Sequence, residues 1–149
     1  MRVRRLDHVV FAVEEIDRAA AAWARAFGLA AEAPLRPANA PVELALMPVG
    51  EPSAQTGARP GAFLELARAL SDEHPLAQQV AARGEGMFSL SLEVADLDAA
   101  VAELRAKGFA ISGPDAGLLP GTRIARFDPA AACGVRLSLI ERKTPSAPR

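Results

Sequence analysis

Residues that could do chemistry in this sequence include His8, Glu43 and Glu65. Each stands in a short stretch of alternating apolar residues, which is the pattern of a half-buried strand. An imidazole and two carboxylates can move protons or bind a divalent metal ion. Glu43 in PVELALM has apolar neighbours, which favour a desolvated acid that transfers protons, but a solvated acid near a strand start explains the pattern equally well. Both interpretations stay open.

An internal repeat relates one of these residues to a second position in the chain. Residues 6–29, LDHVVFAVEEIDRAAAAWARAFGL, repeat in residues 88–109, FSLSLEVADLDAAVAELRAKGF, at an offset of 81 positions with one deletion before the final glycine. Each copy is typical of a strand, a polar break and an amphipathic helix that ends at a glycine. In this alignment His8 corresponds to Ser89.

A second repeat follows further along the chain. FLELAR at residues 63–68 matches RLSLIE at residues 136–141, so Glu65 corresponds to Ser138. The chain is therefore a duplicated module, and we expect its functional site where the two copies face each other. The second copy has serine where the first has a histidine and a carboxylate.

The order of these patterns predicts an α+β fold in which two tandem βαβββ modules form a curled mixed sheet around a central cleft. Turn-forming residues at 50–61 predict an exposed hairpin loop, and proline-rich residues 30–40 predict an irregular strand or loop. Ser71 and Asp72 are the cap candidates of a bridging helix, and Asp96 or its neighbour caps the next one. The predicted strands lie at residues 3–13, 41–49, 62–68, 87–94, 109–112, 122–127 and 135–141, and the helices at 14–27, 71–83 and 96–107. As a single domain over residues 1–149, the chain divides into module one at about 3–70, the bridging helix at about 71–84, module two at about 85–142 and a loose tail at 143–149.

Composition and charge argue against several classes of function. Acidic and basic residues nearly cancel at a net charge of −1, and neither sign forms a long block, which argues against a nucleic-acid or membrane partner. No apolar run is long enough to span a bilayer, and the N-terminus lacks the pattern of a secretion signal. The single Cys133 excludes an intrachain disulfide and fits the reducing cytoplasm, where we expect the protein.

With these motifs the sequence resembles the vicinal oxygen chelate superfamily, which includes glyoxalase I, extradiol dioxygenases, bleomycin-resistance proteins and methylmalonyl-CoA epimerase. The resemblance covers residues 6–141 and rests on LDHVVFAV with its helix and GL, ELARAL-SDEHPLAQQV, GMFSLSLEVADLDAAV and FDP…GVRLSLIE. The spacing and the ELA…HPLAQ segment look closest to the epimerase branch. This resemblance implies a metal ion in the cleft, held by one residue from each of four strands.

The resemblance assigns the metal-ligand positions to His8, Glu65, Ser89 and Ser138. Two of these residues fit a metal and two do not, because stable sites usually have three or four protein ligands and serine hydroxyls are poor ones. We therefore expect no metal cofactor; if a divalent metal binds at all, His8 and Glu65 hold it. Without an ion, a buried Glu65 needs a hydrogen bond, and His8 is its predicted partner. The resemblance also implies that Glu43 occupies the place of the epimerases' acid/base glutamate.

Ser91 and Arg136 are also predicted to line the ligand pocket, together with Ser138. Arg136 shares a strand face with Ser138, where its guanidinium could bind a carboxylate or phosphate group. An edge-strand arginine that reaches solvent is the competing interpretation. For His8, the competing interpretation is a structural histidine satisfied by its neighbours.

Two functions of different classes follow. One is a glyoxalase- or methylmalonyl-CoA-epimerase-like lyase or isomerase with a degenerate metal site, in which Glu43 moves a proton next to a carbonyl. The other is a non-catalytic protein of the bleomycin-resistance type that binds or sequesters a small ligand. In either case we expect a small-molecule ligand and a homodimer.

Overall fold

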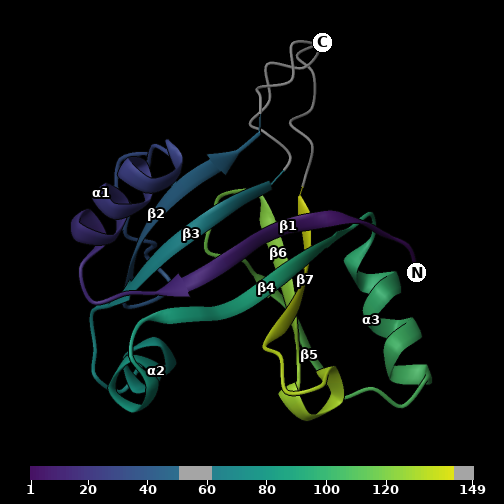
Figure 1. Ribbon diagram of the computed structural model, residues 1–149. Coiled ribbons are helices and arrows are strands. Elements are labelled where there is room, and N and C mark those ends of the chain that lie inside the picture. The colour runs from purple at the N-terminus through teal and green to yellow at the C-terminus, as the bar shows by residue number, and fades with distance from the viewer. Residues whose placement is uncertain (51–61, 143–149) are drawn as a thin grey trace. The chain divides into compact units, whose positions relative to one another are not determined.

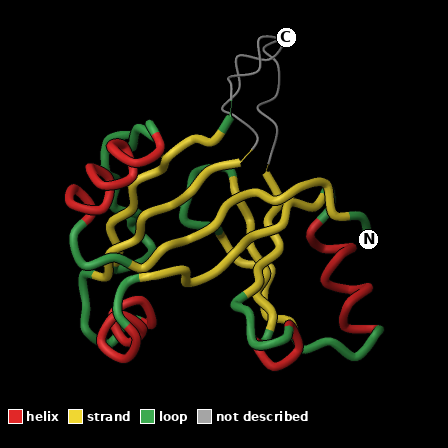
Figure 2. Tube along the Cα trace, viewed as in Figure 1, coloured by secondary structure: helices red, strands yellow, loops and turns green. Residues whose placement is uncertain are grey.

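The computed structural model describes residues 1–50 and 62–142 of the chain. Within these residues the chain has three α-helices and seven β-strands with both parallel and antiparallel neighbours, which is the predicted α+β class (Figures 1 and 2). Residues 51–61 of the loop predicted at 50–61, and the tail at 143–149, lie outside the described residues. The elements are β1 (Val3–Ala12), α1 (Ile16–Phe27), β2 (Val42–Val49), β3 (Ala62–Ala69), α2 (Pro75–Arg83), β4 (Gly86–Val94), α3 (Leu97–Ala106), β5 (Ile111–Ala116), β6 (Thr122–Phe127) and β7 (Leu137–Arg142), with a turn of 3-10 helix at Pro129–Ala132 before β7.

The described chain divides into two compact units. Asp7–Ser89 form the first, which we call the histidine unit. Met1–Leu6 and the described residues from Leu90 onward form the second, which we call the serine unit. The strand β1 therefore begins in the serine unit and continues in the histidine unit. This division into units is based on contacts within each unit. The division into two modules is based on the sequence repeat, and it stays a prediction.

In the histidine unit, β3 is the central strand. It pairs in parallel with β1 and antiparallel with β2. One face of these strands carries α1 (Figure 1), because the apolar stripe of that helix packs against alternate residues of the strands. Ile16 and Trp23 of α1 meet Ala45, Met47 and Leu66 there.

In the serine unit, β4 pairs in parallel with β7, and β6 lies antiparallel between β7 and β5. The helix α3 packs its apolar side on these strands. Leu97, Val101 and Leu104 of the helix form one buried cluster with Ala125 and Leu139. This cluster uses one face of the strands, so the residues between its members along β6 and β7 lie on the other face.

The internal repeat is visible in the pairing of the strands. Val10 lies opposite Glu65 in the β1–β3 pair, and Ser91 lies opposite Ser138 in the β4–β7 pair. These are the correspondences that the sequence alignment predicts. The first-copy counterpart of β5 is reduced to an isolated bridge between Leu35 and Leu44. Pro34 and Pro37 lie close to this bridge and have no N–H to extend the ladder.

Helix ends follow the local sequence, with one correction. Gly28 ends α1 in the left-handed conformation at φ 69°, and Asp96 caps α3 by accepting from the Ala99 N–H at 2.9 Å, both as predicted. The predicted caps of the bridging helix were wrong: α2 begins at Pro75 and its cap is His74. Proline has no N–H and fits the first helical position, so the residue before it becomes the cap. None of the helices in the described residues is long and apolar enough to cross a membrane.

Two strand predictions had wrong bounds. The strand predicted at residues 109–112 begins at Ile111 and continues to Ala116, and the last strand begins at Leu137 and ends at Arg142. β5 continues through a segment that sequence alone indicates as a turn, because Gly113 adopts φ +93° beside the neighbouring strand. A Cβ at this position would lie 2.8 Å from the Ile124 carbonyl oxygen, so only glycine lets the two strands approach here.

Candidate functional site

His8 lies on β1 and is held by two neighbours in the histidine unit. Its Nδ1 is 2.7 Å from Oδ2 of Asp7. Its ring stacks on Phe63 of β3, with the ring centroids 4.8 Å apart and the planes 17° from parallel. Both His8 and Asp7 are buried. The contact at Nδ1 is therefore made by Asp7, and the predicted hydrogen bond between His8 and Glu65 stays a prediction.

Glu65 lies on the same face of the strands as His8. In the parallel register His8 lies opposite Phe63, and Val10 lies opposite Glu65. Residues two apart on one strand share a face, so His8, Phe63 and Glu65 belong to one side. The Glu65 side chain is buried, with 5% of its surface exposed. A buried carboxylate and a buried imidazole thus share this face of the histidine unit.

Glu43 lies on the opposite face of the histidine unit. The antiparallel register places Glu43 opposite Arg68, whereas Leu46 lies opposite Glu65. Glu43 therefore shares the α1-bearing face with Ala45 and Met47. Its carboxylate pairs with Arg36 at 3.1 Å and with Arg68 at 3.8 Å. The two glutamates singled out in the sequence do not share a face in this unit, and the proposed acid/base role of Glu43 stays a prediction.

A matching ion pair occupies the equivalent place in the serine unit with its signs reversed. Arg123 lies opposite Glu141, as Glu43 lies opposite Arg68 in the other copy. Arg123 Nη1 is 3.3 Å from Glu141 Oε2, and the same carboxylate oxygen accepts from the first N–H of α3 at Leu97. In the histidine unit, the arginine of the pair contacts Glu15, the cap residue of α1, at 3.4 Å. Both pairs thus connect the sheet to the start of the helix that packs on it.

The serines of the second copy belong to a longer row of polar residues. Each lies opposite the next across successive strands: Ser112 of β5, Arg126 of β6, Ser138 of β7 and Ser91 of β4. Ser91 and Ser138 are buried, whereas Ser112 and the Arg126 side chain are largely exposed. The Arg126 guanidinium is 3.4 Å from Asp115. This polar row lies on the face opposite α3 and offers hydroxyl and guanidinium donors to an anion or a polar ligand.

Two other predicted pocket residues, Arg136 and Ser89, each stand two positions before a member of this row along the chain. Arg136 is exposed and precedes β7, and its carbonyl oxygen accepts from the Leu90 N–H at 3.1 Å. Ser89 is half-buried on β4. Two residues after Ser91 on the same strand, the buried Glu93 pairs with Arg5 at 2.5 Å. This ion pair places a carboxylate on the face of the polar row, and the sequence prediction did not include it among the site residues.

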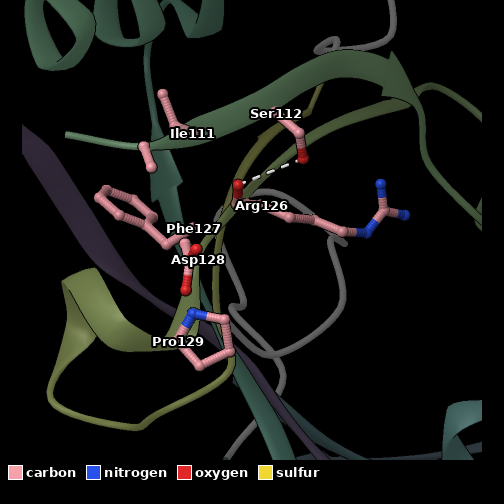
Figure 3. A pocket seen from close by; sticks show the side chains of 7 residues that line it. Ile111, Ser112, Arg126, Phe127, Asp128 and Pro129 are labelled. Atoms are coloured by element: carbon pink, nitrogen blue, oxygen red, sulfur yellow. Dashed lines mark hydrogen bonds between the residues drawn. The ribbon is translucent and has the colours of Figure 1, made fainter.

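An open pocket of about 530 Å³ lies at the β5 edge of the serine unit. Figure 3 shows the Arg126 and Phe127 side chains extending to opposite sides of β6, with the Ser112 hydroxyl donating to the Arg126 carbonyl oxygen at 3.3 Å. Of the residues predicted for the site, none lines this pocket. The lining residues are Ala110, Ile111, Ser112, Arg126, Phe127, Asp128 and Pro129.

The side chains available for a metal do not fit the three- or four-ligand centre that the superfamily implies. In residues 1–50 and 62–142, no three His, Cys, Asp or Glu side chains come together to hold an ion. At the two positions where the resemblance assigns further ligands, Ser89 and Ser138 have neutral hydroxyls that bind divalent cations poorly. We therefore derive no chemical step through a metal.

Residues that the sequence prediction missed are Asp7, Glu93, Ser112 and Arg126. Asp7 had a local signal, since it directly precedes His8, but neighbours on a strand ordinarily point to opposite faces. Ser112 and Arg126 had none, because their place beside Ser138 depends on the pairing of three strands. Glu93 shares a face with Ser91 by its spacing along β4, but its ion pair with Arg5 joins residues far apart in sequence.

Comparisons with known proteins agree with this architecture. Residues 7–125 match the model of the glyoxalase/bleomycin resistance protein/dioxygenase superfamily. No curated protein matches the chain. A variant of Streptomyces coelicolor methylmalonyl-CoA epimerase in complex with 2-nitronate-propionyl-CoA has a similar fold, with a TM-score of 0.83 and 23% identity over 96% of this chain and 100% of that one. Methylmalonyl-CoA epimerase from Mycobacterium tuberculosis gives a TM-score of 0.80 and 26% identity over 95% of this chain and 90% of that one.

A further methylmalonyl-CoA epimerase structure gives a TM-score of 0.80 and 25% identity over 95% of this chain and 97% of that one. These likenesses extend over almost the whole chain, and they agree with the branch of the family that the sequence resembles. The family model alone covers most of the chain. The protein therefore belongs to the glyoxalase/bleomycin resistance protein/dioxygenase superfamily.

Proposed function

We propose that this protein is an isomerase-type enzyme that moves a proton on the carbon atom next to a carbonyl or thioester group of a small molecule. The observation that carries the proposal is the face of the histidine unit on which the buried Glu65 and His8 lie together. The likeness to methylmalonyl-CoA epimerases supports it. One of these neighbours is a complex with 2-nitronate-propionyl-CoA, and a further methylmalonyl-CoA epimerase structure is a complex with methylmalonyl-CoA, so acyl-CoA thioesters are the first substrates to test.

The chemistry needs a group that takes a proton and a group that returns one. In this proposal the Glu65 carboxylate takes the proton from the carbon, and the C–H electron pair becomes an enolate delocalised onto the carbonyl oxygen. The imidazolium form of His8 then returns a proton to the carbon, and the reverse reaction exchanges the two roles. Burial keeps bulk water from both groups, which favours transfer to the substrate over transfer to solvent.

We assign the carboxylate role to Glu65 rather than to Glu43 because of the register. Glu43 lies on the α1-bearing face and pairs with two arginines. Its counterpart Arg123 connects the sheet to a helix start in the serine unit, which supports a structural role for Glu43 as well. Variants of the two glutamates therefore separate the two assignments.

The test is the incorporation of solvent deuterium next to the thioester, measured by mass spectrometry with acyl-CoA thioesters and 2-oxo acids in heavy water. Deuterium incorporation reports proton removal even when the overall reaction gives no measurable change in product. We expect Glu65→Gln to lower the incorporation rate at least about 100-fold, as is typical when a proton-transfer group is removed. The matched control Glu43→Gln should stay within about threefold of the parent rate. Full activity in Glu65→Gln, or loss only in Glu43→Gln, would refute the assignment.

Binding without turnover is a second candidate, and the polar row of the serine unit favours it. Arg126 and the serines opposite it across the strands offer donors for a carboxylate or phosphate group. Isothermal calorimetry with the same thioesters distinguishes the candidates. Binding that is weakened by Arg126→Gln, without deuterium incorporation in the parent protein, would establish the binding function and refute the enzyme proposal.

A further inference from the structure

The strongest unassigned feature is the buried contact between neighbouring residues Asp7 and His8. Oδ2 of Asp7 lies 2.7 Å from Nδ1 of His8. The Asp7 side chain is fully buried, at 0% exposed, and His8 is 8% exposed. A buried carboxylate is stable only when it is hydrogen-bonded or paired, so this contact is part of what makes the burial of Asp7 tolerable.

The contact determines where the proton of a neutral His8 resides. An ionised carboxylate only accepts hydrogen bonds, so Nδ1 must be the donor. A neutral imidazole carries one N–H, and Nε2 then holds the lone pair. The stacked Phe63 ring at 4.8 Å limits rotation of the imidazole out of this arrangement. Together these neighbours set both the tautomer and the orientation of the ring.

The second histidine of the chain has the opposite arrangement. Nδ1 of His74 accepts from the Leu76 N–H at 3.2 Å, so this nitrogen holds the lone pair and Nε2 carries the proton. The protein has two histidines, and the structure gives them different tautomers. His74 is therefore an internal reference for any measurement on His8.

We propose that Asp7 is a positioning residue that keeps the proton of neutral His8 on Nδ1 and makes Nε2 the atom that exchanges a proton with the substrate. When Nε2 takes a proton, the ring becomes an imidazolium whose charge the Asp7 carboxylate stabilises, as an aspartate does for the histidine of a serine-protease triad. This inference rests on the proposed function for its catalytic consequence, because His8 shares its face with Glu65. The tautomer itself does not depend on any substrate.

The first measurement is the tautomer, by nitrogen-15 NMR of the histidine side chains in the whole protein above pH 7.5. We expect protonated Nδ1 in His8 and protonated Nε2 in His74. Asp7→Leu removes the acceptor and should shift His8 toward the Nε2–H form, while the His74 signals stay unchanged. Asp7→Asn can turn its amide N–H toward Nδ1 and should shift His8 the same way. Protonated Nε2 in His8 of the unaltered protein would overturn the proposal, and that measurement needs no variant to fold.

The second measurement is deuterium incorporation by the same variants. We expect Asp7→Asn to lower kcat at least about 100-fold with KM within about threefold, because the wrong tautomer removes the acceptor but not the binding surface. Asp17→Asn, which changes an exposed carboxylate in the first turn of α1, is the matched control and should behave as the parent. Unchanged kcat in Asp7→Asn with a shifted tautomer would refute the positioning role. If the parent protein itself incorporates no deuterium, the proposed function fails while the tautomer result still tests the role of Asp7 in orienting His8.

Discussion

Replacing His74 by alanine should destabilise the protein at neutral pH and much less in acid. His74 caps α2 through Nδ1, which accepts from the Leu76 N–H at 3.2 Å. Pro75 fills the first helical position and has no N–H, so the Leu76 N–H is the first donor of the helix that needs an acceptor. Removing a side-chain cap costs about 0.5–2 kcal/mol of unfolding free energy. We expect about 1 kcal/mol here, because His74 is only half-buried and water can partly replace the lost acceptor.

The pH dependence follows from the same nitrogen. Burial lowers the pKa of His74 below its usual value of 6.5, so the unfolded chain binds a proton more readily than the folded one. The cap contribution is fully present above pH 6.5 and declines as the pH falls from there through the folded pKa. A protonated Nδ1 cannot accept the Leu76 N–H, so the cap itself is lost in acid. As the pH is lowered, the stability of the parent should therefore decrease, and the stability of His74→Ala should decrease less.

The assay is urea unfolding at pH 7.5 and pH 5.0, followed by Trp23 fluorescence and circular dichroism. Trp23 is the single tryptophan and packs in the core of the histidine unit, which contains α2. His74→Asn is the control, because an asparagine keeps the cap without titrating and should match the parent at pH 7.5 and exceed it at pH 5.0. Equal stability of parent and His74→Ala at pH 7.5, or a difference that does not shrink at pH 5.0, would refute this reasoning.

Three further predictions concern the serine unit. Leu97→Ala empties a fully buried position at the start of α3 and should cost about 2–5 kcal/mol in urea unfolding, whereas Phe27→Ala, at 70% exposed, should change stability by less than about 0.5 kcal/mol. Gly113→Ala should cost more than about 1 kcal/mol, because the residue has φ +93° and its Cβ would meet the Ile124 carbonyl oxygen; a neutral substitution would show that β5 adjusts. Hydrogen bonds from Arg123 lower the pKa of Asp98 below its usual 3.8, so their contribution to stability is present above pH 3.8 and is lost as the pH falls further. Arg123→Gln should therefore weaken the decrease in unfolding free energy below pH 4, as measured by circular dichroism.

The paired ion bridges show how duplication separates structural from functional residues. Glu43 and Arg68 in one copy correspond to Arg123 and Glu141 in the other, at the same register position and with reversed charge. Each pair connects its sheet to the N-terminal end of its helix. Charge reversal preserves such an attraction between the sheet and the start of the helix. This comparison supports the structural interpretation of Glu43.

The sequence alone determined the class of fold, the repeat and most of the elements. Alternating apolar residues locate β1 and β6 because a strand has a period of two, and glycines and caps such as Gly28 and Asp96 act within one helical turn. The correspondence of Glu65 with Ser138 is also a sequence result, and the matching registers of the two copies confirm it.

Only the tertiary structure decided which chemical groups meet. The pattern of one strand shows which of its own residues share a face. Which residues of the neighbouring strand lie on that same face depends on the pairing register, and loops and core packing set the register. Both faces of β2 are buried, so the pattern could not show that Glu43 and Glu65 point to opposite sides. For the same reason the sequence did not show that Arg126 lies opposite Ser138. The contact of Asp7 with His8 was also known only from the tertiary structure, because side-chain contacts follow from packing and not from spacing along the chain.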